Sequence, residues 1–227
     1  MIQFFRVAWL IAHKDMMIEA RSREIVATTV FFAISCTLVF AFALVREGRT
    51  VADAASGILW IAIAFSGTLA LGRTFEHERY SDTLRALMLA PADRPAIYAG
   101  KLAGIVAMLI AVEVLLVPLV ALLFQAPLFA RLELLVPLLV LGTVGFAAVG
   151  TLFAAMLVRT RTRDVLLPVL LYPITIPVII AGVRGTAALL ADPPDVAMAQ
   201  FWIALLGFFD VVFLVLSLWT FEPLMTE

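Results

Sequence analysis

Six long apolar stretches dominate the sequence, at residues 25–45, 55–71, 102–124, 134–158, 165–183 and 201–221. A helix needs about 20 apolar residues to cross the hydrocarbon core of a bilayer, and each stretch reaches or approaches that length. The composition agrees, because 64% of the residues are hydrophobic and 15% are charged, against about 45–50% and about 25% in soluble domains. We therefore expect an all-α, polytopic membrane protein with six transmembrane helices in residues 25–221 and a short tail at 222–227.

The segment before the first span differs from a cleavable signal peptide, because charged residues from Arg6 to Glu24 interrupt its apolar residues. Several apolar side chains of residues 1–24 can share one face of a helix, namely Phe4, Phe5, Ala8, Ile11, Met16 and Ile18. This pattern predicts an amphipathic helix lying in the headgroup region of the membrane. A solvated extension is the alternative.

Lysine and arginine are unevenly divided between the connections. The N-terminal segment, the connection at 72–101 and the connection at 159–164 carry twelve of the 16 basic residues, and the other three connections carry four. Basic residues accumulate on the cytoplasmic side of membrane proteins. We therefore expect both termini and these two connections to be cytoplasmic.

Three spans carry distinctive residues, with prolines in the fifth and small residues in the third and fourth. Pro168, Pro173 and Pro177 predict that the fifth span is kinked or partly unwound and lies inside the bundle, because freed backbone groups need neighbouring protein or water. Residues 184–200 are expected to form a short outer helix and a turn. Small residues allow close helix packing, and they occur in a Gly-x-x-x-Gly pattern at the start of the third span and in a stripe of the fourth: Gly100, Gly104, Thr143, Ala147, Thr151 and Ala155. We expect them to pack within the bundle, and a dedicated dimer face is the alternative.

Residues 73–101 connect the second and third spans and carry many charged residues with a helical pattern. We call them the coupling segment. Tyr80, Leu84, Leu87 and Met88 fall on one face of a helix, and Arg79, Asp82 and Arg85 lie opposite. Pro91 then ends the helix, and Asp93 can cap the next one. The pattern predicts a short helix parallel to the membrane that another protein can grip, or alternatively a solvated hairpin.

Two acids and one tyrosine place polar groups within the spans. Glu113 and Asp210 lie near the middle of the third and sixth spans, where a charge costs about 3 kcal/mol or more. We expect both carboxyl groups to be neutral unless a cation or water reaches them. They either line a polar path or relay, or bond to a neighbouring helix. Tyr172, among the prolines, either lines a path or packs.

Cofactor chemistry has few candidate residues. His13 and His77 are the only histidines and both lie outside the spans, so we expect no axial heme ligand, and Met108 and Met156 are expected to be packing residues. Cys36 cannot form an internal disulfide. The net charge of −1 argues against nucleic acid. No phosphate-binding Gly-x-x-x-x-Gly-Lys loop is present, so any ATP chemistry must come from a partner.

The coupling segment, "RTFEHERYSDTLRALMLAPADRPAIYAGK", closely resembles the heme exporter protein B (CcmB) family, the membrane subunit of the cytochrome c maturation ABC transporter. The stretches "LLPVLLYPITIPVIIAG" and "GILWIAIAFSGTLALGR" look like the fifth and second spans of that family. The family pattern is carried by Arg73, Phe75, Glu78, Pro91 and Lys101. Arg85 departs from it, because the family more often has an acidic residue there.

The resemblance implies an ABC-2-type permease in the bacterial inner membrane, without catalytic activity of its own. The coupling segment would dock on an ATP-binding subunit, with Arg79, Asp82 and Arg85 setting register and Leu84, Leu87 and Met88 giving contact area. Other cytochrome c maturation membrane subunits would be partners, and heme would be a substrate of the system, with no cofactor held by this chain. Two alternatives remain: an ABC-2 exporter of another amphipathic substrate, and a proton-coupled secondary transporter using Glu113 or Asp210.

Overall fold

The computed structural model describes residues 2–46, 49–50, 54–81, 94–158, 160 and 162–224. The described residues form these helices: α1 (Ile2–Ser22), α2 (Glu24–Ala43), α3 (Ala55–Ser81), α5 (Arg94–Phe124), α6 (Leu132–Met156), α7 (Arg163–Leu190) and α8 (Val196–Leu224). A 3₁₀ turn, η2 (Leu128–Arg131), precedes α6, and two short strands, β1 (Val45–Arg46) and β2 (Arg49–Thr50), pair in antiparallel register between α2 and α3. Six helices are long and apolar enough to cross a membrane, which confirms the predicted all-α polytopic fold.

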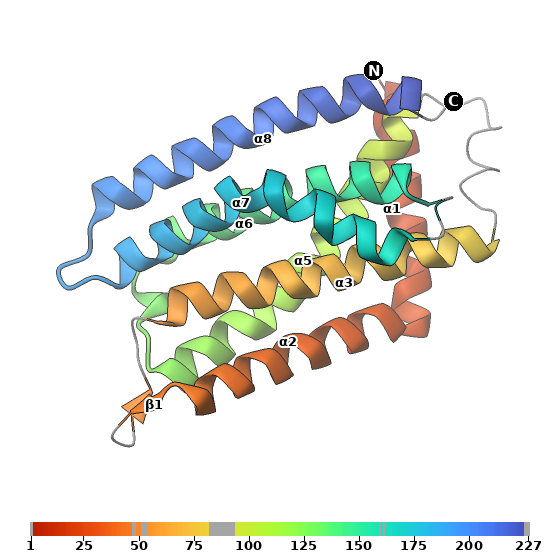
Figure 1. The fold of residues 1–227 in the computed structure, drawn as a ribbon. Helices are drawn as coiled ribbons and strands as arrows, with labels where there is room; N and C mark the ends of the chain where they lie inside the picture. The colour runs from red at the N-terminus through yellow and green to blue at the C-terminus, as the bar shows by residue number, and fades with distance from the viewer. Residues whose placement is uncertain are drawn as a thin grey trace.

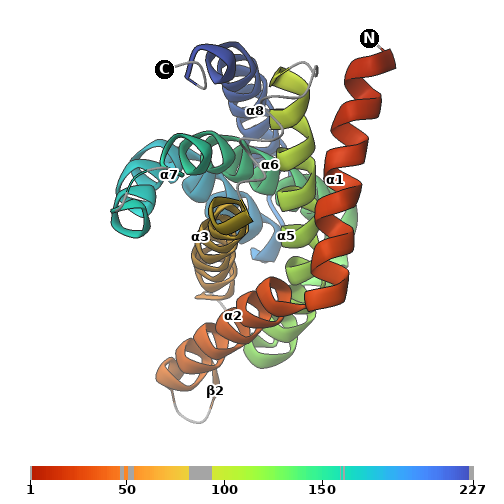
Figure 2. The same ribbon diagram turned by 90° about the vertical axis from the view of Figure 1, so that its right-hand side faces the viewer.

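The six spans run side by side, and α1 lies crosswise at one end of them (Figures 1 and 2). At this end lie the start of α1 and the end of α8, the end of α3 and the start of α5, and the end of α6 and the start of α7 (Figure 1). The β1–β2 hairpin, η2 and the turn between α7 and α8 lie at the other. We call the end with α1 the basic end, because its segments are those that carry most of the lysine and arginine.

Several helices extend beyond the apolar stretches that predicted them. The second span was expected to end at residue 71, but α3 continues to Ser81, and α5 starts at Arg94 rather than at 102. The short outer helix expected after residue 184 is wrong, because α7 continues to Leu190 and is followed directly by a turn. Hydropathy marks where side chains leave lipid, whereas backbone hydrogen bonding carries a helix on into water.

The three prolines of α7 do not unwind it, which corrects the expected partial unwinding. Residues 163–190 form one continuous α-helix containing Pro168, Pro173 and Pro177. The expected internal position is also wrong: Pro173 and Pro177 are exposed, and α3 and α6 are the most buried of the six candidate spans. The two exposed prolines are four residues apart and therefore share the helix face that points away from the bundle.

Glycines let large side chains of α3 fit against α6 and α7. Trp60 is 2% exposed, and its ring occupies the positions where side chains of Gly142 on α6 and Gly182 on α7 would stand. Leu71 fills the corresponding space at Gly150. These close approaches place α3 at the centre of the bundle.

The crosswise helix α1 packs on α5 through the first glycine of the Gly-x-x-x-Gly pattern. A Cβ on Gly100 would lie 2.7 Å from the Ala8 carbonyl oxygen and 2.8 Å from the Ile11 Cβ, so the prediction of packing within the bundle is confirmed there. The helix predicted in residues 1–24 is observed as α1, and its place in the headgroup region stays a prediction. Its apolar side chains have two kinds of surroundings. Ile11 is buried, whereas Phe5 and Met16 are 67% and 50% exposed, because one side of α1 faces α5 and another faces outward.

Candidate functional site

The coupling segment connects two helices that meet at the basic end. The apolar part of α3 ends at Thr74, and the helix continues for seven residues to Ser81, about 10 Å at 1.5 Å per residue. Phe75, Glu78 and Arg79 belong to these last turns. The other predicted partner-binding residues lie outside the described part of the chain: Asp82, Leu84, Arg85, Leu87, Met88 and Pro91. Their docking role stays a prediction.

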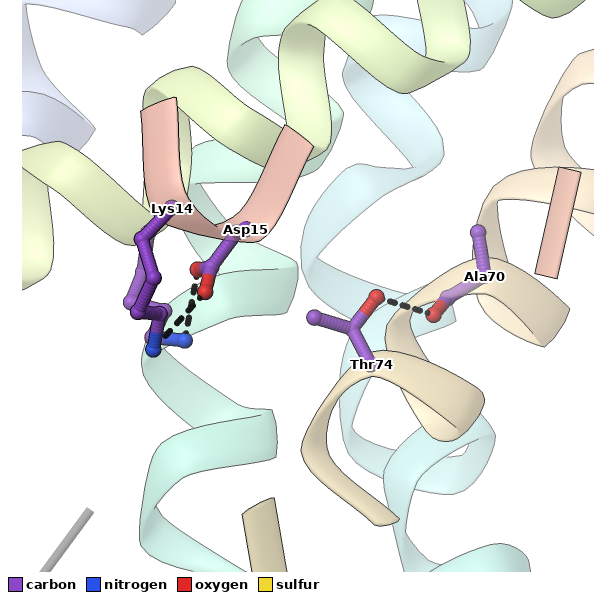
Figure 3. A network of polar contacts seen from close by, with 5 residues as sticks. Lys14, Asp15, Ala70 and Thr74 are labelled. Atoms are coloured by element: carbon purple, nitrogen blue, oxygen red, sulfur yellow. Dashed lines mark hydrogen bonds and ion pairs between the residues drawn. The ribbon is translucent and has the colours of Figure 1, made fainter. Parts of the chain in front are cut away.

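Arg73 and Lys101, at the two ends of the coupling segment, have different surroundings. Arg73 is exposed on α3. Lys101 is 3% exposed, and its Nζ lies 2.6 Å from Oδ2 of Asp15 on α1; the other carboxylate oxygen of Asp15 lies 3.0 Å from the Lys14 Nζ. Figure 3 shows these contacts converging on the Asp15 carboxylate. Lys101 therefore fastens α1 to α5, a contact within the chain that the partner-binding prediction did not include.

Three hydrogen bonds connect α3 to α7 along their length. At the basic end, Arg163 Nη2 donates to the Gly72 carbonyl oxygen over 2.8 Å. Further along, the hydroxyl groups of Tyr172 and Thr68 are hydrogen bonded at 3.2 Å.

The third of these bonds joins Trp60 Nε1, as donor, to Thr186 Oγ1 over 3.0 Å. Hydrogen bonds between membrane helices contribute about 0.6 kcal/mol each on average. Together with the glycine contacts of Trp60, they make α3 and α7 a connected pair.

The carboxyl group of Glu113 is hydrogen bonded to a neighbouring helix. Its side chain is 4% exposed on α5, and its Oε1 is hydrogen bonded to the hydroxyl of Thr143 on α6. This arrangement is the second of the two predicted alternatives, a carboxyl bonded to a neighbouring helix. Thr143 was noted in the sequence only as part of a small-residue stripe.

Asp210 differs from Glu113, because neither of its oxygens has a hydrogen-bond partner among the described residues. It is 4% exposed on α8, and its Oδ1 lies where a side chain of Gly145 on α6 would begin. Thr143 and Gly145 are two residues apart, about 200° around a helix. Glu113 and Asp210 therefore lie on different sides of α6, and the geometry does not join them into one relay.

The remaining candidates are distributed over the molecule. Tyr172 is half-buried and packs edge-on against Phe65 with ring centroids 6.0 Å apart. His13 is exposed on α1 and stacked on Trp9. In the part of the chain that the structure describes, no group of three or more His, Cys, Asp or Glu side chains could hold a metal ion.

Sequence reasoning missed the residues that tie helices together. Arg163 was counted only as part of a basic connection, yet it is 4% exposed and bonds to α3. Trp60 was not singled out in the second span. A usable signal existed in the glycines of α6 and α7, because small residues let membrane helices approach closely.

Six packed spans with a crosswise amphipathic helix define a polytopic α-helical membrane protein. A family model described as "CcmB protein" matches residues 6–223. The "Heme exporter protein B" of Rhodobacter capsulatus is 35% identical over 173 residues, which cover 74% of this chain and 78% of that protein. That of Paracoccus denitrificans is 35% identical over 175 residues, covering 72% and 75%. That of Pseudomonas aeruginosa is 28% identical over 186 residues, covering 82% of each. The chain belongs to the CcmB protein family.

Proposed function

We propose that this chain is the non-catalytic membrane subunit of an ABC transporter complex for cytochrome c biogenesis. An ATP-binding subunit docks on the coupling segment at the cytoplasmic face of the bacterial inner membrane, together with other cytochrome c maturation membrane subunits. The match to the CcmB family over nearly the whole chain is the observation that carries this proposal. The relatives' shared name, heme exporter protein B, supports heme as the substrate of the system.

The geometry suggests how ATP hydrolysis in the partner would act on the bundle. The α3 helix runs without a break from the coupling segment into the centre of the protein. A displacement of its end is therefore passed to Trp60 and, through the bonds of Gly72, Thr68 and Trp60, to α7. Tilting of α3 and α7 together would either move a substrate or release a heme-loaded chaperone on the far side. The absence of a histidine from all six spans favours mechanical coupling over an axial heme site in this chain.

Substitutions on the predicted apolar face of the coupling segment test whether the ATP-binding subunit docks there. We expect L84D/L87D to abolish copurification of the ATP-binding subunit from mild detergent. Docking of the helix in an apolar groove of the partner would bury both new carboxylates, and the free-energy cost of removing them from water exceeds what the apolar contact contributes. The protein should still insert, since neither residue lies in a span. The measurement is the amount of ATPase recovered per membrane subunit.

A matched control places two acids at the opposite end of the bundle. Phe129 and Leu132 are 52% and 45% exposed near η2, so F129D/L132D makes the same change away from the coupling segment and should leave copurification intact. Equal loss in both variants would indicate general disruption and remove the support for docking. The function itself fails if complexes lacking this chain still release the heme chaperone when ATP is supplied.

A further inference from the structure

The start of α5, residues 94–101, is the end of the coupling segment that returns to the membrane. No residue of 94–101 is exposed, although the coupling segment as a whole is rich in charge. Five of these residues are buried: Ala96, Ile97, Tyr98, Gly100 and Lys101. In the view of Figure 2, α5 lies between α1 and α8. The start of α5 therefore cannot shift without the helices that surround it.

Tyr98 joins the start of α5 to α6. Its side chain is fully buried, and its hydroxyl group donates to the Ala148 carbonyl oxygen of α6 over 2.9 Å. This carbonyl lies within α6, where the regular helical hydrogen bond uses one of its two lone pairs. The tyrosine hydroxyl takes up the other lone pair. It satisfies a buried donor and fixes the distance between α5 and α6.

The ring of Tyr98 joins the start of α5 to α8. Its centroid lies 5.4 Å from that of Phe221, which is 3% exposed in the last turn of α8. Further into the bundle, a cavity of about 260 Å³ opens between the two helices, and its lining includes Val106 of α5 and Leu214 of α8. The ring pair therefore closes the contact between α5 and α8 at the basic end.

The residues that follow this tyrosine hold α1. Gly100 packs against Ala8, and Lys101 is paired with Asp15. The start of α5 thus connects α1, α6 and α8. The hydrogen bonds described for α3 lead to α7 instead. The two ends of the coupling segment are therefore tied by polar contacts to different helices.

We propose that Tyr98 is a positioning residue that passes movement of the coupling segment to α6 through its hydroxyl group and to α8 through its ring. The inference rests on the proposed function, because it requires an ATP-binding subunit that moves the coupling segment. It adds a second route to the one through α3 and α7. Close-packed interiors transmit strain, and a side chain held at both its ring and its hydroxyl group has little freedom to absorb it.

The test compares Y98F with the wild-type chain in the purified complete complex. The measurements are the copurified ATPase, the rate of ATP hydrolysis, and the heme chaperone released per ATP hydrolysed. We expect the first two to stay within about twofold and release per ATP to fall about threefold, the factor that corresponds to one hydrogen bond between membrane helices. Thermal stability should change little, because the Ala148 carbonyl keeps its helical hydrogen bond.

A second variant and a matched control accompany Y98F. F221L removes the ring contact but keeps the hydroxyl bond, and it should also lower release per ATP. Thr175 is fully buried, and its hydroxyl group donates to the Leu171 carbonyl oxygen of its own helix over 2.9 Å. T175V therefore removes a buried hydroxyl group without loosening a contact between helices, and release per ATP should stay at the wild-type value.

The outcomes separate this inference from the proposed function. Unchanged release per ATP in Y98F, with an active wild-type complex, overturns the inference and leaves the proposed function intact. An equal fall in T175V, or a lower unfolding temperature of Y98F without a lower ratio, would assign Tyr98 a purely structural role. A loss confined to Y98F would remove α8 from the route. If Y98F does not assemble, unchanged release in F221L overturns the inference in its place. A wild-type complex without ATP-dependent release would refute the proposed function, and the inference with it.

Discussion

Glu113 and Asp210 show how the same functional group, a carboxyl group, can have two different surroundings inside one bundle. Glu113 bonds to Thr143 across the interface of α5 and α6, and this contact substitutes for water. Asp210 is equally buried but has no hydrogen-bond partner among the described residues. A charged carboxylate in either place would be costly, so both are expected to act as neutral groups.

Neutral isosteres of the two acids test the proton-coupled alternative. An amide oxygen can accept from Thr143 as a carboxyl oxygen does, so we expect E113Q/D210N to retain assembly and ATP-dependent chaperone release within about twofold. The measurement is release by reconstituted complexes without a pH gradient. Loss of release from a fully assembled double variant, or release driven by a pH gradient without ATP, would favour the secondary transporter.

At the scale of elements, the pairing of α3 with α6 and α7 depends on glycines as well as on hydrogen bonds. Trp60 fits only because Gly142 and Gly182 have no side chains. Its indole N–H then reaches Thr186, which satisfies a buried donor. The pair can move as a unit because both packing and hydrogen bonding hold it.

Adding one methyl group at this contact should loosen the bundle. We expect G182A to lower the stability of the protein in detergent by about 1–3 kcal/mol, the usual cost of overpacking, because the new Cβ would stand inside the Trp60 ring. G57A, on α3 itself, has no atom within 4 Å of the added Cβ and should be neutral or slightly stabilising. Thermal unfolding of both variants checks this, and equal behaviour would contradict the packing account.

The sequence was sufficient to predict the six spans but not the contacts between the helices. Apolar length located all six spans, because lipid imposes that length directly. The ends of α3 and α7 were misplaced, because nothing in hydropathy stops a helix at the membrane surface. The roles of Lys101 and Arg163 were missed for a different reason. Their partners, Asp15 and Gly72, are far away in the chain, and a single sequence contains no record of such pairs.

At the scale of the molecule, the basic end and the opposite end define the two sides of the membrane. The twelve basic residues assigned to the N-terminal segment and two connections predict that the basic end is cytoplasmic. The coupling segment must face that side for an ATP-binding partner to reach it. Sidedness is therefore a condition for the proposed function.

Cysteine labelling measures the sidedness. In a C36S background, A191C lies exposed in the turn between α7 and α8, and R21C lies exposed at the end of α1. We expect a membrane-impermeant maleimide to label A191C in intact spheroplasts and R21C only after lysis. The reverse pattern would place the coupling segment outside and rule out the ATP-driven model.

The packing of α1 against Gly100 of α5 has a consequence for biosynthesis. The ribosome makes α1 before α5, and the glycine and the Lys101 ammonium that contact α1 belong to α5, the third span. During translation of the intervening residues, α1 has no docking site within its own chain. The outward side chains of α1, including Phe5, Trp9 and Met16, are apolar, so α1 can lie on the lipid surface until it docks. Therefore α1 can reach its final position only after α5 has been synthesised.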